Sequence, residues 1–198
     1  FVMLIMNCEK YKWKADIQRE TWLKKVPPYI KYYHVIGNED LETEYNFDNE
    51  LNILYVKTPD DYNSLPNKVI SSFKAINDSF SYKYIFKTDD DQNLVNDNFF
   101  EILYNLLNAK GLPIHYGGHI IKVSTPYLSE YYKIHPELPN DIHIKTTKYC
   151  NGRFYFLSHK SIQYLITKRE YICKEYLEDY AIGYHMHNFF KNNILKID

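Results

Sequence analysis

The sequence lacks the features that mark several large classes of protein. Its longest apolar run near the start, residues 1–6, is too short to cross a bilayer, and no secretory signal is present. The formal net charge is −1, and acidic and basic residues are interspersed without a basic stripe or a polybasic run. We therefore expect no nucleic acid as a partner and no membrane contact within this segment.

Cysteine and glycine are also scarce. The three cysteines, Cys8, Cys150 and Cys173, fit no zinc spacing, and their odd number and wide separation leave the redox compartment open. No Gly-rich phosphate loop follows the first apolar run, where the sequence reads Asn7-Cys8-Glu9-Lys10. The chain opens inside a strand-like run, so we expect the domain to be part of a longer protein.

What remains is the composition of one globular domain, with 45% apolar and 25% charged residues in a chain of 198. Strands and helices alternate through the first half, which favours a parallel sheet covered on both faces. The predicted strands lie at residues 1–6, 32–37, 51–56, 84–88, 115–123 and 153–157. The predicted helices lie at about 16–26, 67–77, 98–107, 160–167 and 180–190. Two long loops are expected, an acidic surface loop at 39–50 and a functional loop at 124–145.

The most informative stretch is the apolar run that ends in Asp89, Asp90 and Asp91. Ligands of open α/β sheets bind at the carboxyl ends of strands. Carboxylates there suit Mg²⁺ or Mn²⁺, whose shell a substrate phosphate completes. The alternative interpretation is a loop that caps the next helix through Asp97 or Asn98.

Five segments in order resemble the β-1,3-galactosyltransferase family, which also holds β-1,3-N-acetylglucosaminyltransferases and the Fringe enzymes. They are Arg19-Glu20-Thr21-Trp22, residues 61–68, Phe86-Lys87-Thr88-Asp89-Asp90-Asp91, residues 149–158, and Leu177-Glu178-Asp179-Tyr180-Ala181-Ile182-Gly183. Lys14 also stands where the family often has a basic residue. The departures are Gln18, in place of an apolar residue, and Ser64 and Pro66, in place of Asn and Thr.

The resemblance implies a GT-A-type α/β fold with a Rossmann-like, mostly parallel sheet flanked by helices. It implies a single catalytic domain over residues 1–198, with a nucleotide-sugar-binding half at about 1–110 and a smaller acceptor-binding half at about 111–198. It further implies a metal-dependent, inverting transfer of a hexose, galactose or N-acetylglucosamine, from a UDP-sugar to a glycan or glycoprotein hydroxyl. The product is a β-linkage, β-1,3 by the resemblance.

The resemblance also assigns roles. Asp91 and Asp89 would hold Mn²⁺ or Mg²⁺, and Asp89 and Asp90 would contact the donor. Arg19 and Lys68 would line the nucleotide site. Asp179 would be the catalytic base with Glu178 beside it, because inversion needs a base opposite the leaving group. Tyr149, Gly152 and Arg153 are candidates for acceptor binding.

Several alternatives stay open at this point. Asp179 precedes a predicted helix, so a capping role competes with catalysis. His185 and His187 have the wrong spacing for one helical face, so we expect the C-terminal histidine ligand of related enzymes to lie beyond Asp198 or to be absent. A degenerate module that binds nucleotide or glycan without turnover is the main rival function. A nucleotidyltransferase also uses acids at strand ends, but the missing Gly-rich loop disfavours it. Family members usually face the Golgi lumen, whereas a viral or protist source would allow the cytosol.

Overall fold

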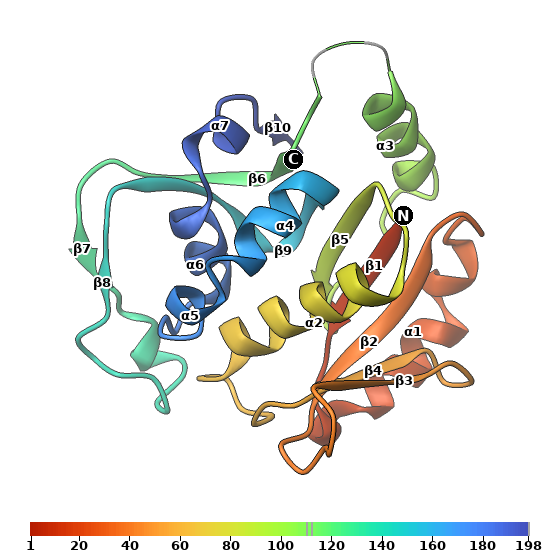
Figure 1. Cartoon of the computed structure of the whole chain (residues 1–198), viewed down its shortest axis with the longest axis horizontal. Helices are drawn as coiled ribbons and strands as arrows, with labels where there is room; N and C mark the ends of the chain where they lie inside the picture. Colours follow the sequence, from red (N-terminus) through yellow and green to blue (C-terminus); the bar gives the residue numbers. More distant parts are fainter. Residues whose placement is uncertain (110, 112, 198) are drawn as a thin grey trace.

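The computed structural model describes residues 1–109, 111 and 113–197, and a mixed sheet forms its centre (Figure 1). In the described residues this sheet has eight strands in the order β10-β6-β9-β5-β1-β2-β4-β3. Their bounds are β1 Val2–Met6, β2 Lys31–Gly37, β3 Tyr45–Asp48, β4 Ile53–Val56, β5 Tyr84–Asp89, β6 Tyr116–Val123, β9 Thr147–Ser158 and β10 Leu195–Lys196. The helices are α1 Trp13–Glu20, α2 Leu65–Ser79, α3 Phe99–Asn108, α4 His159–Ile166, α5 Arg169–Ile172, α6 Glu178–His185 and α7 Asn188–Lys191, with 3₁₀ helices η1 Glu9–Tyr11, η2 Trp22–Lys25 and η3 Tyr131–Lys133.

The central strands are parallel, as the alternation of strands and helices predicts. β1 pairs in parallel with β2 on one side and with β5 on the other. The register sets Met6 beside Val35 and also beside Asp89. The carboxyl ends of the three strands therefore meet at one edge of the sheet, and the three aspartates begin there.

The second half of the chain extends the same sheet with antiparallel strands. β9 lies between β5 and β6 and pairs antiparallel with both, while the short β10 pairs in parallel with β6. Because the β5–β9 pairing ends at Thr88 and Phe154, the earlier residues of β9 continue past the end of β5. The two predicted halves thus share one sheet, and the predicted boundary at about residue 110 lies outside the described residues.

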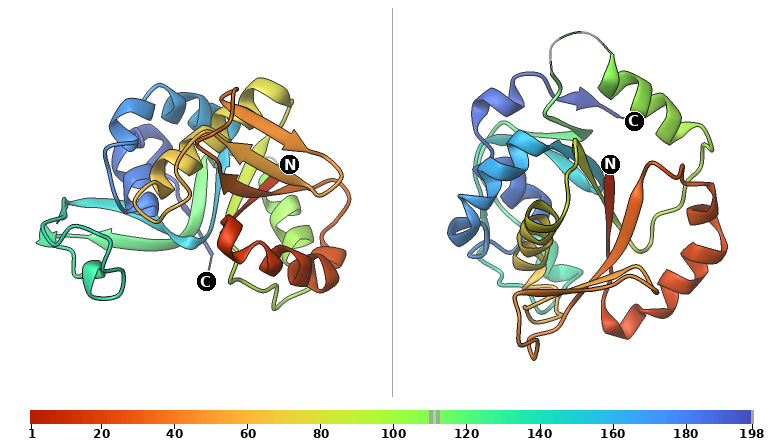
Figure 2. Two further views of the ribbon diagram at one scale, coloured as in Figure 1. Left: turned by 90° about the horizontal axis from the view of Figure 1, so that it is seen from below. Right: turned by 45° about the vertical axis from the view of Figure 1, so that its right-hand side comes forward.

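Helices cover both faces of the sheet (Figure 2). Side chains alternate along a strand, so successive residues of β1 pack on opposite faces. Val2, Leu4 and Met6 pack with α2, α4, α5 and α6, whereas Met3 and Ile5 pack with η2 and α3. The α/β fold expected from the sequence, a mostly parallel sheet flanked by helices, is confirmed.

Several elements differ from the sequence-based expectations. The first predicted helix is interrupted at Thr21, and Ile17 within it is 52% exposed. The acidic loop contains β3, which pairs with β4 as an antiparallel edge strand. The last predicted helix is broken at Met186 and His187, which have extended backbone between α6 and α7. The acidic sequence did not predict β3, because an edge strand tolerates polar side chains on both faces and therefore lacks a clear apolar pattern.

The predicted functional loop forms an arm that projects from the ends of β6 and β9 (Figure 2). It contains the short strands β7 (Tyr127–Leu128) and β8 (His143–Ile144), which pair with each other, and η3. The arm is anchored to the segment before α2: the His135 ring stacks on Tyr62 at 3.9 Å, and Asn63 donates to the Glu137 carbonyl. Among the described residues, no helix is long and apolar enough to cross a membrane.

Candidate functional site

The three aspartates leave β5 as a fixed loop at the carboxyl edge of the sheet. The Asp90 amide donates to the Met6 carbonyl, which continues the β1–β5 pairing by one residue. The buried Gln18 holds the loop from α1, because its amide nitrogen donates to the carbonyls of Asp90 and Gln92. Its amide oxygen lies 2.9 Å from Nε2 of the buried His34. Gln18, a departure from the family pattern, therefore has a clear structural role here.

Each aspartate has a different environment. Asp89 accepts from the Lys87 ammonium at 2.7 Å, and Asp90 accepts from the Lys14 ammonium at 2.9 Å. Asp91 is exposed and accepts only a neutral hydrogen bond from the Gln92 amide among the contacts of the described residues. Burial raises the pKa of Asp90, and the nearby Lys14 opposes this effect. Asn98 is at the N-cap of α3, as the alternative interpretation predicts, but no side-chain hydrogen bond caps the helix.

These aspartates suit a divalent ion that is bound by few protein ligands and completed by substrate phosphates. Within the part of the chain that the structure describes, no three His, Cys, Asp or Glu side chains gather closely enough to hold a metal by themselves. Mg²⁺-type ions, however, are commonly held by one or two carboxylates together with substrate phosphates. Asp91 presents such a carboxylate to solvent, with Asp89 beside it on the same loop.

A second network stabilises the neighbouring strand ends. The Lys68 ammonium, on α2, donates to the Asn7 carbonyl at 2.9 Å and to Asp60 Oδ1 at 2.5 Å. Asp60 also accepts from the backbone amides of Gly37 and Glu9. Lys68 thus lies at the predicted edge, but it is buried beneath it and ties together the ends of β1 and β2.

The structure does not bring Arg19 to these acids. Its guanidinium pairs with Asp16 at 2.7 Å and donates to the Leu51 carbonyl. Leu51 precedes β4, which runs parallel to β2, so this contact is at the amino-terminal end of the strands. α1 begins near the carboxyl edge and runs back along the sheet, and its last turn therefore lies away from the donor site. Arg19 has no part in the site described below.

The second acid pair, Glu178 and Asp179, lies beside Asp89, and Lys87 connects Glu178 to Asp89. The Lys87 side chain is 1% exposed, and its ammonium lies 2.7 Å from Asp89 Oδ1 and 2.9 Å from Glu178 Oε2. It also donates to the Gly152 carbonyl at 2.9 Å. The hydroxyl of the buried Tyr155 donates to the other oxygen of Glu178. Two acidic motifs that are far apart in the sequence are therefore joined by one buried cation.

Asp179 is oriented by backbone amides. Its Oδ2 accepts from the Gly152 amide at 3.0 Å, and its Oδ1 accepts from the amide of Tyr180 at 2.7 Å. Burial raises the pKa of Asp179, and Lys87 and the two amides oppose the rise. Burial likewise raises the pKa of Glu178 to about 7, with Lys87 and Tyr155 acting in the opposite direction. A carboxyl group with a raised pKa is a better proton acceptor near neutral pH than an ordinary aspartate.

The position of α6 depends on a glycine. A Cβ atom built on Gly183 would lie 2.1 Å from the Tyr149 Cβ, so α6 packs directly on the backbone of β9. Gly152 faces the start of the same helix: a Cβ there would lie 3.2 Å from the Lys87 ammonium and 3.4 Å from Glu178 Oε2. These two close approaches bring the acids of α6 against the end of β5.

Tyrosines surround Asp179. Its negative charge contributes to the raised pKa of Tyr62, Tyr127 and Tyr149, although burial is the largest cause for each. Tyr149 packs edge-on against Tyr180 and is half-buried, whereas Tyr127 on the arm is 50% exposed. Tyrosine presents both a ring face and a hydroxyl, which suits a sugar ligand.

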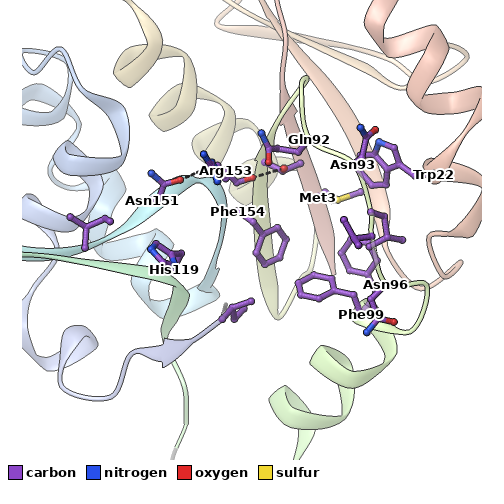
Figure 3. A pocket seen from close by; sticks show the side chains of 16 residues that line it. Met3, Trp22, Gln92, Asn93, Asn96, Phe99, His119, Asn151, Arg153 and Phe154 are labelled. Carbon is purple, nitrogen blue, oxygen red and sulfur yellow. Dashed lines mark hydrogen bonds between the residues drawn. The ribbon is translucent and has the colours of Figure 1, made fainter. Parts of the chain in front are cut away.

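Arg153 lies on the other face of the sheet. It lines a cavity of about 540 Å³ together with Thr88, Gln92, Phe154 and, across from them, Trp22 (Figure 3). Thr88 Oγ1 donates to the Arg153 carbonyl at 2.7 Å. The register of β9 is irregular between Cys150 and Tyr155, opposite Ile120 and Gly118. Within this irregular stretch Gly152 faces Asp179, whereas Arg153 and Phe154 both line the cavity. Of the three candidate acceptor residues, Tyr149 and Gly152 are near the base and Arg153 is not.

The two histidines also lie away from the acids. His185 Nε2 is 3.0 Å from a Glu175 carboxylate oxygen, and His187 accepts from the Phe189 amide at the start of α7. Both therefore have local structural contacts, in line with the expectation from their spacing.

Sequence reasoning missed Lys87, Gln18 and Tyr155 as parts of the site. Lys87 had a recognisable signal, because a lysine inside a buried strand needs an acidic partner. Gln18 was noted only as a departure from the family pattern. Tyr155 had no signal, since it is one of 21 tyrosines in the chain.

A mostly parallel sheet has acids at its carboxyl edge, and a second acid pair lies beside them. The chain belongs to the galactosyltransferase family: the model of that family, described as Galactosyltransferase, matches residues 14–190. Members of this family use a nucleotide-sugar donor and a glycan acceptor. No curated protein sequence matches the chain.

Solved structures that are similar to the chain include two kinds of enzyme. One is the galactosyltransferase LgtC in complex with donor and acceptor sugar analogs, with 10% identity and a TM-score of 0.47 over 100% of this chain and 73% of that one. Another is the bifunctional IspDF from Campylobacter jejuni, with 12% identity and a TM-score of 0.45 over 100% of this chain. The chain spans about half, 48%, of the length of IspDF.

Proposed function

We propose that this chain is a metal-dependent, inverting transferase that moves a hexose, galactose or N-acetylglucosamine, from a UDP-sugar to a hydroxyl of a glycan or glycoprotein. The linkage formed is β, and β-1,3 by the family resemblance. The observation that carries the proposal is the Lys87 bridge between Asp89 and Glu178. It joins the acids suited to a metal-bound diphosphate with the acids suited to proton abstraction.

In this proposal the donor lies over the carboxyl edge of the sheet. Asp91 and Asp89 would hold Mn²⁺ or Mg²⁺, and Asp90, fixed by Lys14 and the Met6 carbonyl, would contact the donor. Lys68 supports this edge from beneath through Asn7 and Asp60. A bound divalent ion supplies neutralisation of the charge that develops on the departing diphosphate.

The acceptor hydroxyl approaches Asp179 from the side of the arm. Asp179 takes the hydroxyl proton while the acceptor oxygen forms a bond to the anomeric carbon. The bond from that carbon to the diphosphate oxygen breaks, and UDP leaves with the electron pair. Each oxygen of Asp179 accepts one backbone amide, which fixes the carboxylate and leaves a further lone pair for the proton. Tyr149 is positioned to contact the acceptor beside this base.

The first test is a calorimetric titration of UDP with and without Mn²⁺, on the wild type and on Asp91→Ala. We expect binding that requires Mn²⁺ and is lost in the variant. Asp97→Ala is the matched control, because Asp97 is an exposed aspartate paired with Lys25, away from β5. Absence of UDP binding under every condition would refute the donor site.

Turnover of UDP-galactose and UDP-N-acetylglucosamine with an acceptor panel is then measured on wild type and Asp179→Asn. Loss of a general base costs about 10²- to 10⁴-fold in rate. We expect such a loss with UDP affinity retained. Mn²⁺-dependent UDP binding without turnover in the wild type would instead support the rival function, a degenerate binding module.

A further inference from the structure

Lys87 is an unusual residue for the centre of a sheet. It is the only charged side chain among the largest fully buried ones of the described residues, and it lies between Phe86 and Thr88 on the buried strand β5. A lysine is almost never fully buried unless it is paired. Its ammonium has three donors, and the structure supplies three acceptors: Asp89, Glu178 and the Gly152 carbonyl.

The three acceptors belong to the two sides of the site. Asp89 begins the loop suited to the metal and donor, whereas Glu178 immediately precedes Asp179. Gly152 is held from both ends, because its carbonyl accepts from Lys87 and its amide donates to Asp179. A shift of the ammonium would therefore be transmitted through Gly152 to the amide that orients Asp179.

The surrounding structure restricts Lys87 to this position. Its ring neighbour is Tyr155, the cross-strand partner on β9, with the ammonium 5.6 Å from the ring centroid. Tyr155 also donates to Glu178, so Lys87 on β5 and Tyr155 on β9 both bind the Glu178 carboxylate. On the remaining side a Cβ at Gly152 would lie only 3.2 Å from the ammonium, so a side chain there would compress the contact.

From this geometry, and resting on the proposed function, we propose that Lys87 is a positioning residue that sets the base Asp179 relative to the donor acids, and that residue 152 is glycine to leave room for this contact. Lys87 does not itself contact the reacting atoms. It acts through Glu178 and through the Gly152 carbonyl, and the amide of the same residue donates to Asp179. The expected consequence is on the rate of transfer more than on donor affinity, since Lys87 contacts only one of the three donor-side acids, Asp89, whereas Asp90 and Asp91 have other partners.

Lys87→Met keeps the length of the side chain and removes the charge. We expect UDP to bind with full stoichiometry and an affinity within about threefold of wild type, while kcat for transfer falls by at least about 100-fold, the loss that follows a misplacement of about 1 Å. Lys83→Met is the matched control, because Lys83 is exposed on the same segment and donates to Asn108. Gly152→Ala presses on the same contact from β9, and we expect kcat to fall by at least about 10-fold.

A second readout does not depend on catalysis. Hydrogen exchange of the Gly152 amide reports its bond to Asp179, and we expect Lys87→Met to accelerate this exchange at least about 10-fold. Accelerated exchange with no turnover in the wild type would overturn the proposed function and leave the positioning role standing. The positioning role is overturned if Lys87→Met and Lys83→Met have the same Gly152 exchange rate and the same kcat per UDP-binding site. It is also overturned if the kcat of Lys87→Met falls only in proportion to the fraction of protein that binds UDP. Gly152→Ala decides the question if Lys87→Met fails to fold.

Discussion

Replacement of Gly183 by alanine tests whether the close contact of α6 with β9 builds the site. A Cβ at this position would lie 2.1 Å from the Tyr149 Cβ and 2.7 Å from its Cα. Both neighbours are at or next to the backbone and cannot rotate away. Carbon atoms in ordinary contact are about 3.5–4.0 Å apart, so α6 must move by about 1.5 Å at this point.

The size of the effect follows from what α6 carries. The helix begins at Glu178, and the bonds of Asp179 to the Gly152 amide and of Glu178 to Lys87 are 3.0 and 2.9 Å long. A shift of about 1.5 Å breaks hydrogen bonds of this length. We expect overpacking to lower the free energy of unfolding by about 1–3 kcal/mol and kcat to fall by about 100-fold or more.

The assays are urea unfolding and turnover of a UDP-sugar, with UDP binding used to count the folded sites. Gly111→Ala is the matched control, because a Cβ at Gly111 has no atom within 4 Å. The same chemical change in open space should leave both stability and turnover at the wild-type level. Wild-type stability and kcat in Gly183→Ala would refute the packing of α6 on β9 and, with it, the site described above.

Four further predictions concern charge and the carboxyl edge. The raised pKa of Asp179 means that kcat/KM declines as pH falls through a value above the 3.8 of an ordinary aspartate, and a limb at or below 3.8 would contradict its burial. Glu178 keeps a proton in the folded state between its ordinary pKa of 4.5 and about 7, so without divalent ions the free energy of unfolding should decrease as pH rises through this window, and Glu178→Gln should flatten the slope. Gln18→Leu removes both donors to the aspartate loop, and we expect about 1–3 kcal/mol lower stability and weaker Mn²⁺-dependent UDP binding, whereas unchanged affinity in calorimetry would show that the loop holds itself. Lys68→Met leaves Asp60 without its cation beneath the edge, and we expect a loss of about 3–5 kcal/mol in denaturant unfolding, an expectation that fails if the midpoint is unchanged.

The local pattern of apolar and polar residues was sufficient to predict most of the strands and helices. Buried apolar runs, such as the one that becomes β1, and the helical spacing of Val69, Phe73 and Ile76 in α2 identify elements whose burial the structure confirms. Such patterns succeed because one face or one run must be removed from water. The edge strand β3 was missed because it lies within an acidic segment and pairs only with β4. The break between α6 and α7 was missed because no glycine or proline marks it.

For the site, sequence determined the types of residue and the tertiary structure decided their partners. Three consecutive aspartates after a buried strand, and the ordered motifs around them, were enough to predict a family and a list of acids. The list did not separate Arg19, whose helix carries it to the far end of the strands, from Gln18, which the same helix brings to the aspartate loop. Nor did it separate Gly152, which faces Asp179, from Arg153, which lines the cavity on the other face of the sheet because the register of β9 is irregular there.

The bridge between the two acid pairs was beyond sequence reasoning. Lys87 meets Glu178 only because β9 lies next to β5 and α6 packs on β9 at Gly183. Each of these contacts joins segments that are far apart in the chain, and no local periodicity reports the distance between them. Composition and order of motifs therefore determined what chemistry the chain carries, while sheet topology and close packing decided which charges share one buried centre.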